Sequence, residues 1–138
     1  MNRFDLQGLA KLRVREARAL LDAGFTAGAY YLAGYAIECA LKACIAKSVK
    51  RHEFPDRRTV NESYTHDLTR LIKIAGLEAA HDAELRGNPQ FALNWAVAKA
   101  WSEEARYSLI KSDIEGRDMY AAVTARTNGV LPWLKKRW

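Results

Sequence analysis

The chain has 138 residues, which is the length of a single domain. Hydrophobic residues make up 49% of it and charged residues 28%, a composition that excludes an intrinsically disordered protein. The 22 Lys and Arg exceed the 16 Asp and Glu by six, so polyanions such as nucleic acid or nucleotides are candidate ligands. The longest stretch without a charge, residues 23–37, is 15 residues long and contains three tyrosines. It is too short and too polar to span a bilayer.

The two cysteines indicate a reduced, cytoplasmic protein. Cys39 and Cys44 lie five residues apart in a helical segment. That offset is about 500° of helix rotation, so the two thiols point to different faces and do not form a bridge within the helix. We expect both to be small core residues. The three histidines are far apart and the cysteines lack zinc-site spacing, so we expect no metal and no cofactor.

Apolar residues recur at helical spacing along almost the whole chain. In the first half, they predict a helix from Arg3 to Asp22, ended by Gly24, and a second helix from Thr26 to about Lys50. The second helix is apolar on most of its sides, and we expect Tyr31 to Ile45 to be largely buried. It is therefore predicted to be the central helix of a bundle.

The second half of the chain predicts a loop followed by shorter helices. Residues 51–64 are rich in charge and contain Pro55, so we expect a loop there. Helical periodicity then predicts short helices over residues 68–75, 77–85 and 91–101. No alternating β pattern of useful length and no internal repeat occur. We therefore predict an all-α fold, in which residues 1–138 form one helical domain.

The last helix is predicted from its first residues. Ser112 and Glu115 have the spacing of a capping box, in which each side chain accepts a hydrogen bond from a free backbone amide. Residues 128–129 and Pro132 are expected to interrupt this helix, because proline removes a helical hydrogen bond. Residues 133–138 are then expected to form one or two final turns.

Glu38 and Lys42 are the first candidate binding residues. They lie four apart on the predicted central helix, in the order that favours an ion pair. One interpretation is a solvated pair worth a few tenths of a kcal/mol. The alternative is that both side chains line a polar pocket inside the bundle.

His66 is the second candidate, in the sequence Tyr-Thr-His-Asp-Leu at the start of a short helix. Thr65 or Asp67 can cap the free amides of that helix. His66 is then either a buried hydrogen-bonding strut or the best acid–base candidate of the chain, since imidazole titrates near neutrality. We expect it to approach Glu38 or the segment 101–107.

The third candidate is the segment 101–107, in which Arg106 and Tyr107 follow Trp101. The guanidinium of Arg106 is expected to pack on an aromatic ring and to hold a carboxylate, with Glu38 as its partner. The same groups are suited to binding a phosphate. Structural and binding interpretations both stay open for this segment.

Several of these segments resemble a known family, the HEPN domain. The resemblance covers nearly the whole chain and is carried by residues 15–21, 29–43, 66–68, 101–107 and 129–135. It implies an up-and-down bundle of four to five main helices plus short ones, and often a homodimer. Many members of the family pair with a minimal nucleotidyltransferase in toxin–antitoxin systems, and many are metal-independent ribonucleases.

The chain departs from the ribonuclease members at their motif. That motif is an arginine followed, after four to six residues, by a histidine near the last helix. Here no histidine follows Arg126, and the chain has none after His81. The family's catalytic assignment therefore transfers to no residue of this chain, and Arg126 is a candidate binding cation only.

The sequence thus predicts a non-catalytic HEPN-like binding domain. Its ligand is expected to be a nucleotidyltransferase-type partner, a nucleotide, or RNA held without cleavage. We also expect a homodimer, formed through the aromatic C-terminal region with Trp133 and Trp138 or through the small residues of the central helix. The alternatives are a ribonuclease with an atypical site, such as His66 with Arg106, and a purely structural interaction module.

Overall fold

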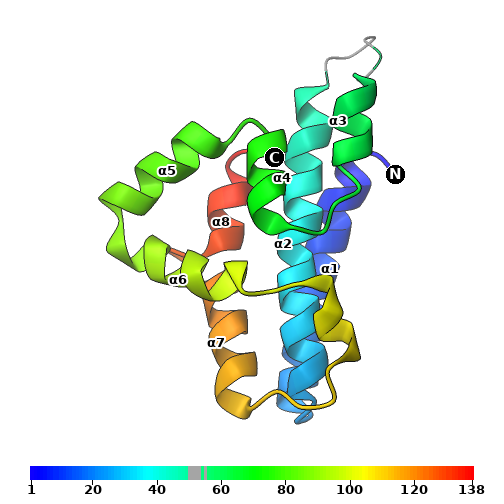
Figure 1. Cartoon of the computed structure of the whole chain (residues 1–138). Coiled ribbons are helices and arrows are strands. Elements are labelled where there is room, and N and C mark those ends of the chain that lie inside the picture. The colour runs from blue at the N-terminus through cyan, green and yellow to red at the C-terminus, as the bar shows by residue number, and fades with distance from the viewer. Residues whose placement is uncertain (50–53, 55) are drawn as a thin grey trace.

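A computed structural model describes residues 1–49, 54 and 56–138. Over these ranges the chain is all-helical, with eight α-helices, one short 3₁₀ helix and no strand. The helices are α1 (Arg3–Asp22), α2 (Thr26–Ser48), α3 (Arg57–Glu62), α4 (Leu68–Ile74), α5 (Glu78–Gly87), α6 (Pro89–Lys99), η1 (Glu103–Tyr107), α7 (Asp113–Thr124) and α8 (Val130–Lys135). Figure 1 shows how they are arranged.

Helices α1 and α2 form a long antiparallel hairpin (Figure 1). The side chain of Asn2 caps α1 in a capping box with Asp5. Gly24 follows the C-cap of α1 with a φ of 84°, a left-handed conformation that costs glycine little. The bounds of the first helix are confirmed as predicted, and α2 begins at Thr26 as predicted.

Helix α2 is the centre of the fold. It contacts α1, α4, α7, α8 and η1. Thirteen of its residues between Ala29 and Ile45 are buried, including both cysteines and Glu38. The predicted central helix is therefore confirmed, because a helix covered on so many sides cannot keep a polar face along its middle.

The remaining helices lie against α2 or beside it. Helices α5 and α6 form a second hairpin that extends to one side, and α7 runs along α2 (Figure 1). Helix α7 begins with the predicted capping box, in which Ser112 and Glu115 each accept a backbone hydrogen bond from the other. The opening of this helix is confirmed.

Two predictions about local structure are wrong. The predicted loop over residues 51–64 contains helix α3, capped by Asp56, whose charged turns carry no apolar periodicity. The predicted interruption at residues 128–129 is present, because α7 ends at Thr124 and α8 begins at Val130. Pro132 does not take part in it but lies in the first turn of α8, where the backbone amides lack intrahelical partners in any case. Pro55 and Lys50, the predicted end of the second helix, lie outside the described residues.

The surfaces that were predicted to meet a second copy are largely covered within one chain. Trp133 is buried against Phe91, with ring centroids 5.4 Å apart. Trp138 is half-buried, with the ammonium of Lys11 5.7 Å from its ring. Gly34, on the small-residue face of α2, lies beneath the indole of Trp101. Trp133 and Gly34 therefore have little surface left for a second copy, and the homodimer itself stays a prediction.

No helix among the described residues is both long enough and apolar enough to cross a membrane.

Candidate functional site

His66 lies in the segment between α3 and α4, and two side-chain caps fix this segment. The hydroxyl of Thr65 accepts a hydrogen bond from the backbone N–H of Asp67 at 3.2 Å. The carboxylate of Asp67 accepts one from the backbone N–H of Arg70 at 3.1 Å and so caps α4. These bonds fix the backbone on the C-terminal side of His66, whose imidazole reaches α2 while 41% of the side chain stays exposed.

Glu38 is the buried partner of His66. Its side chain is only 2% exposed. Its Oε1 accepts a hydrogen bond from Lys42 Nζ at 2.8 Å and from His66 Nδ1 at 2.9 Å. The predicted contact between His66 and Glu38 is confirmed. The interpretation of Glu38 and Lys42 as a solvated pair is wrong, because the Glu38 carboxylate is buried and lies within hydrogen-bond distance of both Lys42 and His66.

The second ring nitrogen of His66 faces another carboxylate. His66 Nε2 lies 3.0 Å from Glu103 Oε2, on η1. In this arrangement His66 links α2 to η1, and neither nitrogen is free to accept a proton from a substrate.

Trp101 fixes the position of η1 on α2. Its indole N–H donates a hydrogen bond to the backbone carbonyl of Tyr31 at 3.1 Å, and its ring stacks on that of Tyr31 with centroids 5.9 Å apart. Trp101 is buried, although it lies just beyond the end of α6. The predicted helix over residues 91–101 therefore ends at Lys99, before Trp101, which anchors η1 on α2.

The other candidate residues lie away from this cluster. The guanidinium of Arg106 lies 4.8 Å from the ring of Tyr107, which is 73% exposed. Arg106 stacks on an aromatic ring as predicted, but the expected pairing with Glu38 is wrong. Arg126 is exposed after the end of α7. The structure thus brings together Glu38, Lys42 and His66, and leaves Arg106, Tyr107 and Arg126 at the surface.

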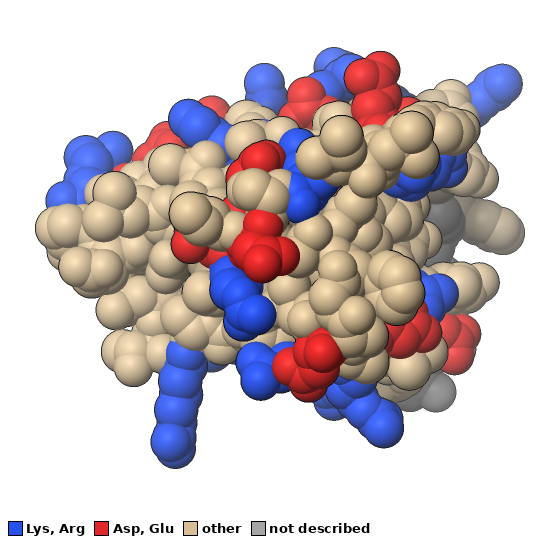
Figure 2. Space-filling model, turned by 90° about the horizontal axis from the view of Figure 1, so that it is seen from below, with Lys and Arg blue, Asp and Glu red and all other residues tan. Residues whose placement is uncertain are grey.

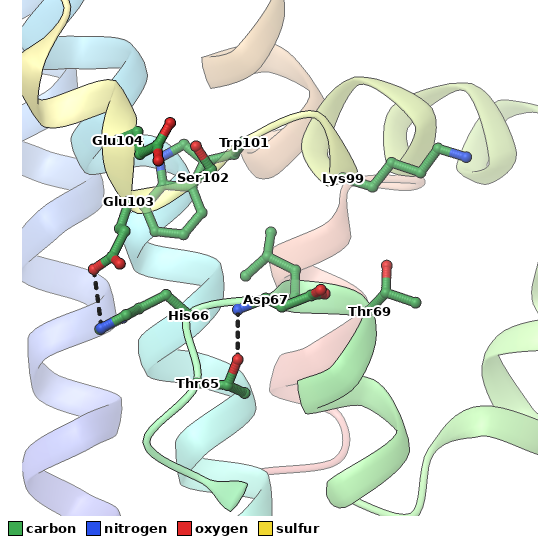
Figure 3. A pocket seen from close by; sticks show the side chains of 10 residues that line it. Thr65, His66, Asp67, Thr69, Lys99, Trp101, Ser102, Glu103 and Glu104 are labelled. Carbon is green, nitrogen blue, oxygen red and sulfur yellow. Dashed lines mark hydrogen bonds and ion pairs between the residues drawn. The ribbon is translucent and has the colours of Figure 1, made fainter.

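A pocket of about 540 Å³ opens beside His66, between the start of α4 and η1 (Figure 3). Its lining residues are Thr65, His66, Asp67, Leu68, Thr69, Lys99, Trp101, Ser102, Glu103 and Glu104. Figure 3 shows the ion pair between His66 and Glu103 at one wall of this pocket. The lining holds three carboxylates but only one lysine, so its field repels phosphate groups.

A second hollow lies between α3 and α4, and cations predominate in its lining. It has a volume of about 480 Å³ and is lined by Arg58, Thr59, Glu62, Arg70, Lys73 and Ile74. Arg58 pairs with Glu62 at 2.9 Å. Arg70 and Lys73 pair with no carboxylate among the described residues. We call this hollow the α3–α4 cleft.

The spacing of two cations in the sequence indicates part of this cleft. Arg70 and Lys73 are three residues apart, and they are exposed on a helix whose Leu68, Leu71 and Ile72 are buried. This spacing places both cations on the solvent face of one helix. Arg58 joins them only because α3 forms within the segment that was predicted to be a loop.

Among the described residues, no group of three or more His, Cys, Asp or Glu side chains is arranged to hold a metal ion. No protein-family model, no curated protein and no solved structure matches this chain. The resemblance to HEPN domains therefore stays a prediction from the residues that carry it, and function has to be inferred from the geometry.

Proposed function

We propose that this chain is a non-catalytic binding domain of HEPN type, an up-and-down helical bundle that holds nucleotide or RNA without cleaving it. The proposal includes a homodimer, and a nucleotidyltransferase-type protein as the partner with which the domain acts. The all-helical fold with a central buried helix supports this proposal. It is also compatible with the residues of α2 that resemble the family.

The observation that most strongly supports phosphate binding is the set of cations that line the α3–α4 cleft. Arg58, Arg70 and Lys73 line one hollow that contains a single carboxylate, and that carboxylate is paired with Arg58. Arginine presents paired N–H donors that match phosphate oxygens, and lysine adds a point charge. Thr59 also lines the hollow, but its hydroxyl donates to Asp56 Oδ2 at 3.3 Å, so the donors for a phosphate are the three cations. A backbone phosphate of RNA or the phosphates of a nucleotide fit this set of donors.

The His66 cluster supports binding rather than catalysis. Metal-independent cleavage of RNA needs a group that deprotonates the 2′-hydroxyl and a cation beside the phosphate. Both nitrogens of His66 are held by carboxylates, and the pocket beside it is acidic. Arg106, the cation considered with His66 for an atypical site, stacks on Tyr107 instead.

The experiment is a comparison of two double variants in RNA binding. In one, Arg70 and Lys73 of the cleft become glutamine; in the matched control, the exposed Lys135 and Lys136 become glutamine. Binding of fluorescent single-stranded RNA is measured by anisotropy over a range of salt concentrations. Each lost phosphate contact lowers the slope of log K against log salt by about 0.7.

We expect the cleft variant to bind RNA more weakly and with a shallower salt slope, while the control stays close to the wild-type protein. An equal loss in both double variants would contradict the proposal, since it would show attraction by net charge without a defined site. Absence of any binding by the wild-type protein to RNA and to nucleotides would contradict it more generally.

A further inference from the structure

One end of the molecule carries a cluster of exposed apolar side chains that neither the His66 pocket nor the α3–α4 cleft uses. Phe25, Leu109, Ile110 and Ile114 are 65%, 95%, 84% and 72% exposed. They belong to the turn between α1 and α2, the segment after η1 and the first turn of α7, which share the lower end of the molecule in Figure 1. We call these four residues the end face.

Hydrogen bonds on both sides of Leu109 and Ile110 fix the backbone that exposes these two side chains. On one side, the hydroxyl of Ser108 donates a hydrogen bond to the carbonyl of Ile110 at 2.9 Å. On the other, the hydroxyl of Thr26 donates one to the carbonyl of Lys111 at 2.6 Å, and the Lys111 ammonium lies 4.4 Å from the ring centroid of Tyr30. The backbone is therefore fixed on both sides of the two side chains, which are turned outward.

The two segments of the end face are joined to one another. A Cβ atom added to Gly116 of α7 would lie 3.2 Å from the side chain of Thr26. The start of α7 therefore packs closely on the start of α2, which brings Ile114 to the same end as Phe25. The four side chains together expose on the order of 500 Å² of apolar surface, as much as the largest patches on monomeric proteins, which are often functional.

A hollow lies directly beside the projecting side chains. It has a volume of about 270 Å³, and its lining includes Gly24, Phe25, Ala27, Gly28, Leu109 and Ile110. The small residues of the turn leave this space open. In a two-fold symmetric dimer the same surface of each copy contacts the other. Such a surface must therefore carry both the projecting side chains and the hollow that receives them.

We propose that the end face is the docking surface for a second copy of this chain, in which Leu109 and Ile110 of each copy enter the hollow of the other. The inference rests on the proposed function in one respect, the homodimer, and it gives that homodimer a different surface from the one predicted by sequence. An interface of standard size needs about 800 Å² from each partner, so the end face supplies its apolar centre and the surrounding polar residues the rest.

The charges around the end face favour a protein surface over a polyanion. The charged residues nearest in sequence are Asp22, Lys111, Asp113, Glu115 and Arg117, with more acids than bases. Figure 2 looks onto this end and shows broad uncharged areas with acidic and basic side chains interspersed. Asp22 and Glu115 pair with Arg18 and Lys111, so both signs of charge surround the end face, which suits a second copy with the same surroundings better than a polyanion.

The test is the mass of the full chain in solution, measured by light scattering at micromolar concentrations. The variants are Ile110→Glu and, to fill the hollow, Ala27→Leu. The control is Leu93→Glu on α6, where an equally apolar side chain is 62% exposed away from the end face. Circular dichroism at the same concentrations shows whether each variant keeps its helical content.

We expect about twice 15.6 kDa for the wild-type protein and for Leu93→Glu. Ile110→Glu and Ala27→Leu should each raise the dissociation constant of the dimer by about 30-fold or more, the effect of losing a central contact. A dimer that Ile110→Glu leaves intact would overturn the end face but keep the homodimer. A wild-type mass of 15.6 kDa at tens of micromolar would overturn both, while RNA binding in the α3–α4 cleft would be unaffected.

Discussion

The indole of Trp101 lies directly on Gly34, at a place where α2 has no room for a side chain. A Cβ atom at position 34 would overlap the ring of Trp101. The indole is further fixed by its hydrogen bond to the carbonyl of Tyr31. Because Glu103 follows Trp101 by two residues, this contact also places the carboxylate that holds His66 Nε2.

Gly34→Ala should therefore destabilise the protein by about 1–3 kcal/mol, the usual cost of overpacking a core. The measurement is urea unfolding followed by circular dichroism. Gly8→Ala is the matched control, because Gly8 lies within α1 and an added Cβ would meet nothing within 4 Å. That control should gain about 0.5–1 kcal/mol from helix propensity. Equal effects of the two substitutions would show that Trp101 moves aside freely.

His66→Ala should lower stability by about 1–3 kcal/mol, since it removes one of the two side chains that hydrogen-bond buried Glu38 and takes the imidazole away from Glu103. Thermal unfolding measures the loss. His66→Gln should recover part of it, because an amide N–H can still donate to Glu38. An unchanged melting temperature in His66→Ala would mean that solvent replaces the imidazole at no cost.

Because His81 is a buried histidine, we expect the stability of the protein to depend on pH. His81 is packed among Phe91, Trp95 and Trp133, and burial lowers its pKa below the ordinary value of 6.5. Between the lowered pKa and 6.5, the unfolded chain binds a proton that the folded chain does not. The stability contributed by His81 is therefore complete above 6.5 and decreases as the pH falls through this window.

Unfolding free energies at about pH 7.5 and about pH 5.5 test this linkage, with His81→Leu as the comparison. The wild-type protein should lose more stability on acidification than the leucine variant does. Parallel decreases in both proteins would assign the acid sensitivity to carboxylates and not to His81.

The cysteines should be unreactive in the folded protein. Burial raises the pKa of the Cys39 and Cys44 thiols to about 11, so little thiolate is present at neutral pH. Ellman's reagent should label neither thiol at an appreciable rate until guanidinium is added, and two thiols afterwards. Rapid labelling of the native protein would place one of the cysteines outside the core.

The sequence predicted the elements that depend on local signals. Helix α1 was recognised from apolar periodicity and a closing glycine, and the start of α7 from Ser112 and Glu115. The meeting of His66 with Glu38 was also predicted, because a capped helix start beside a charged residue on a buried helix leaves few other partners. The two helix predictions needed only neighbours along the chain or along one helix face, whereas His66 and Glu38 are 28 residues apart.

Features that depend on packing between helices could not be predicted in the same way. Arg58 joins Arg70 and Lys73 only through the placement of α3 beside α4. Tryptophan is a residue type that is common at interfaces, yet Trp133 is buried against His81 within the same chain. The end face joins the turn at Phe25 to residues more than eighty positions later, and no periodicity links them.

The central claim is that this domain binds nucleic acid without cleaving it, and one measurement tests it most directly. End-labelled single-stranded RNA is incubated with the wild-type protein in EDTA, at a protein concentration that anisotropy shows to be saturating, and the products are separated on a denaturing gel. The account predicts that bound RNA stays intact, because His66 is held by Glu38 and Glu103 and the phosphates lie in the α3–α4 cleft. Cleavage that disappears in both His66→Ala and Arg106→Ala, with both variants still folded, would contradict it and identify the protein as a ribonuclease.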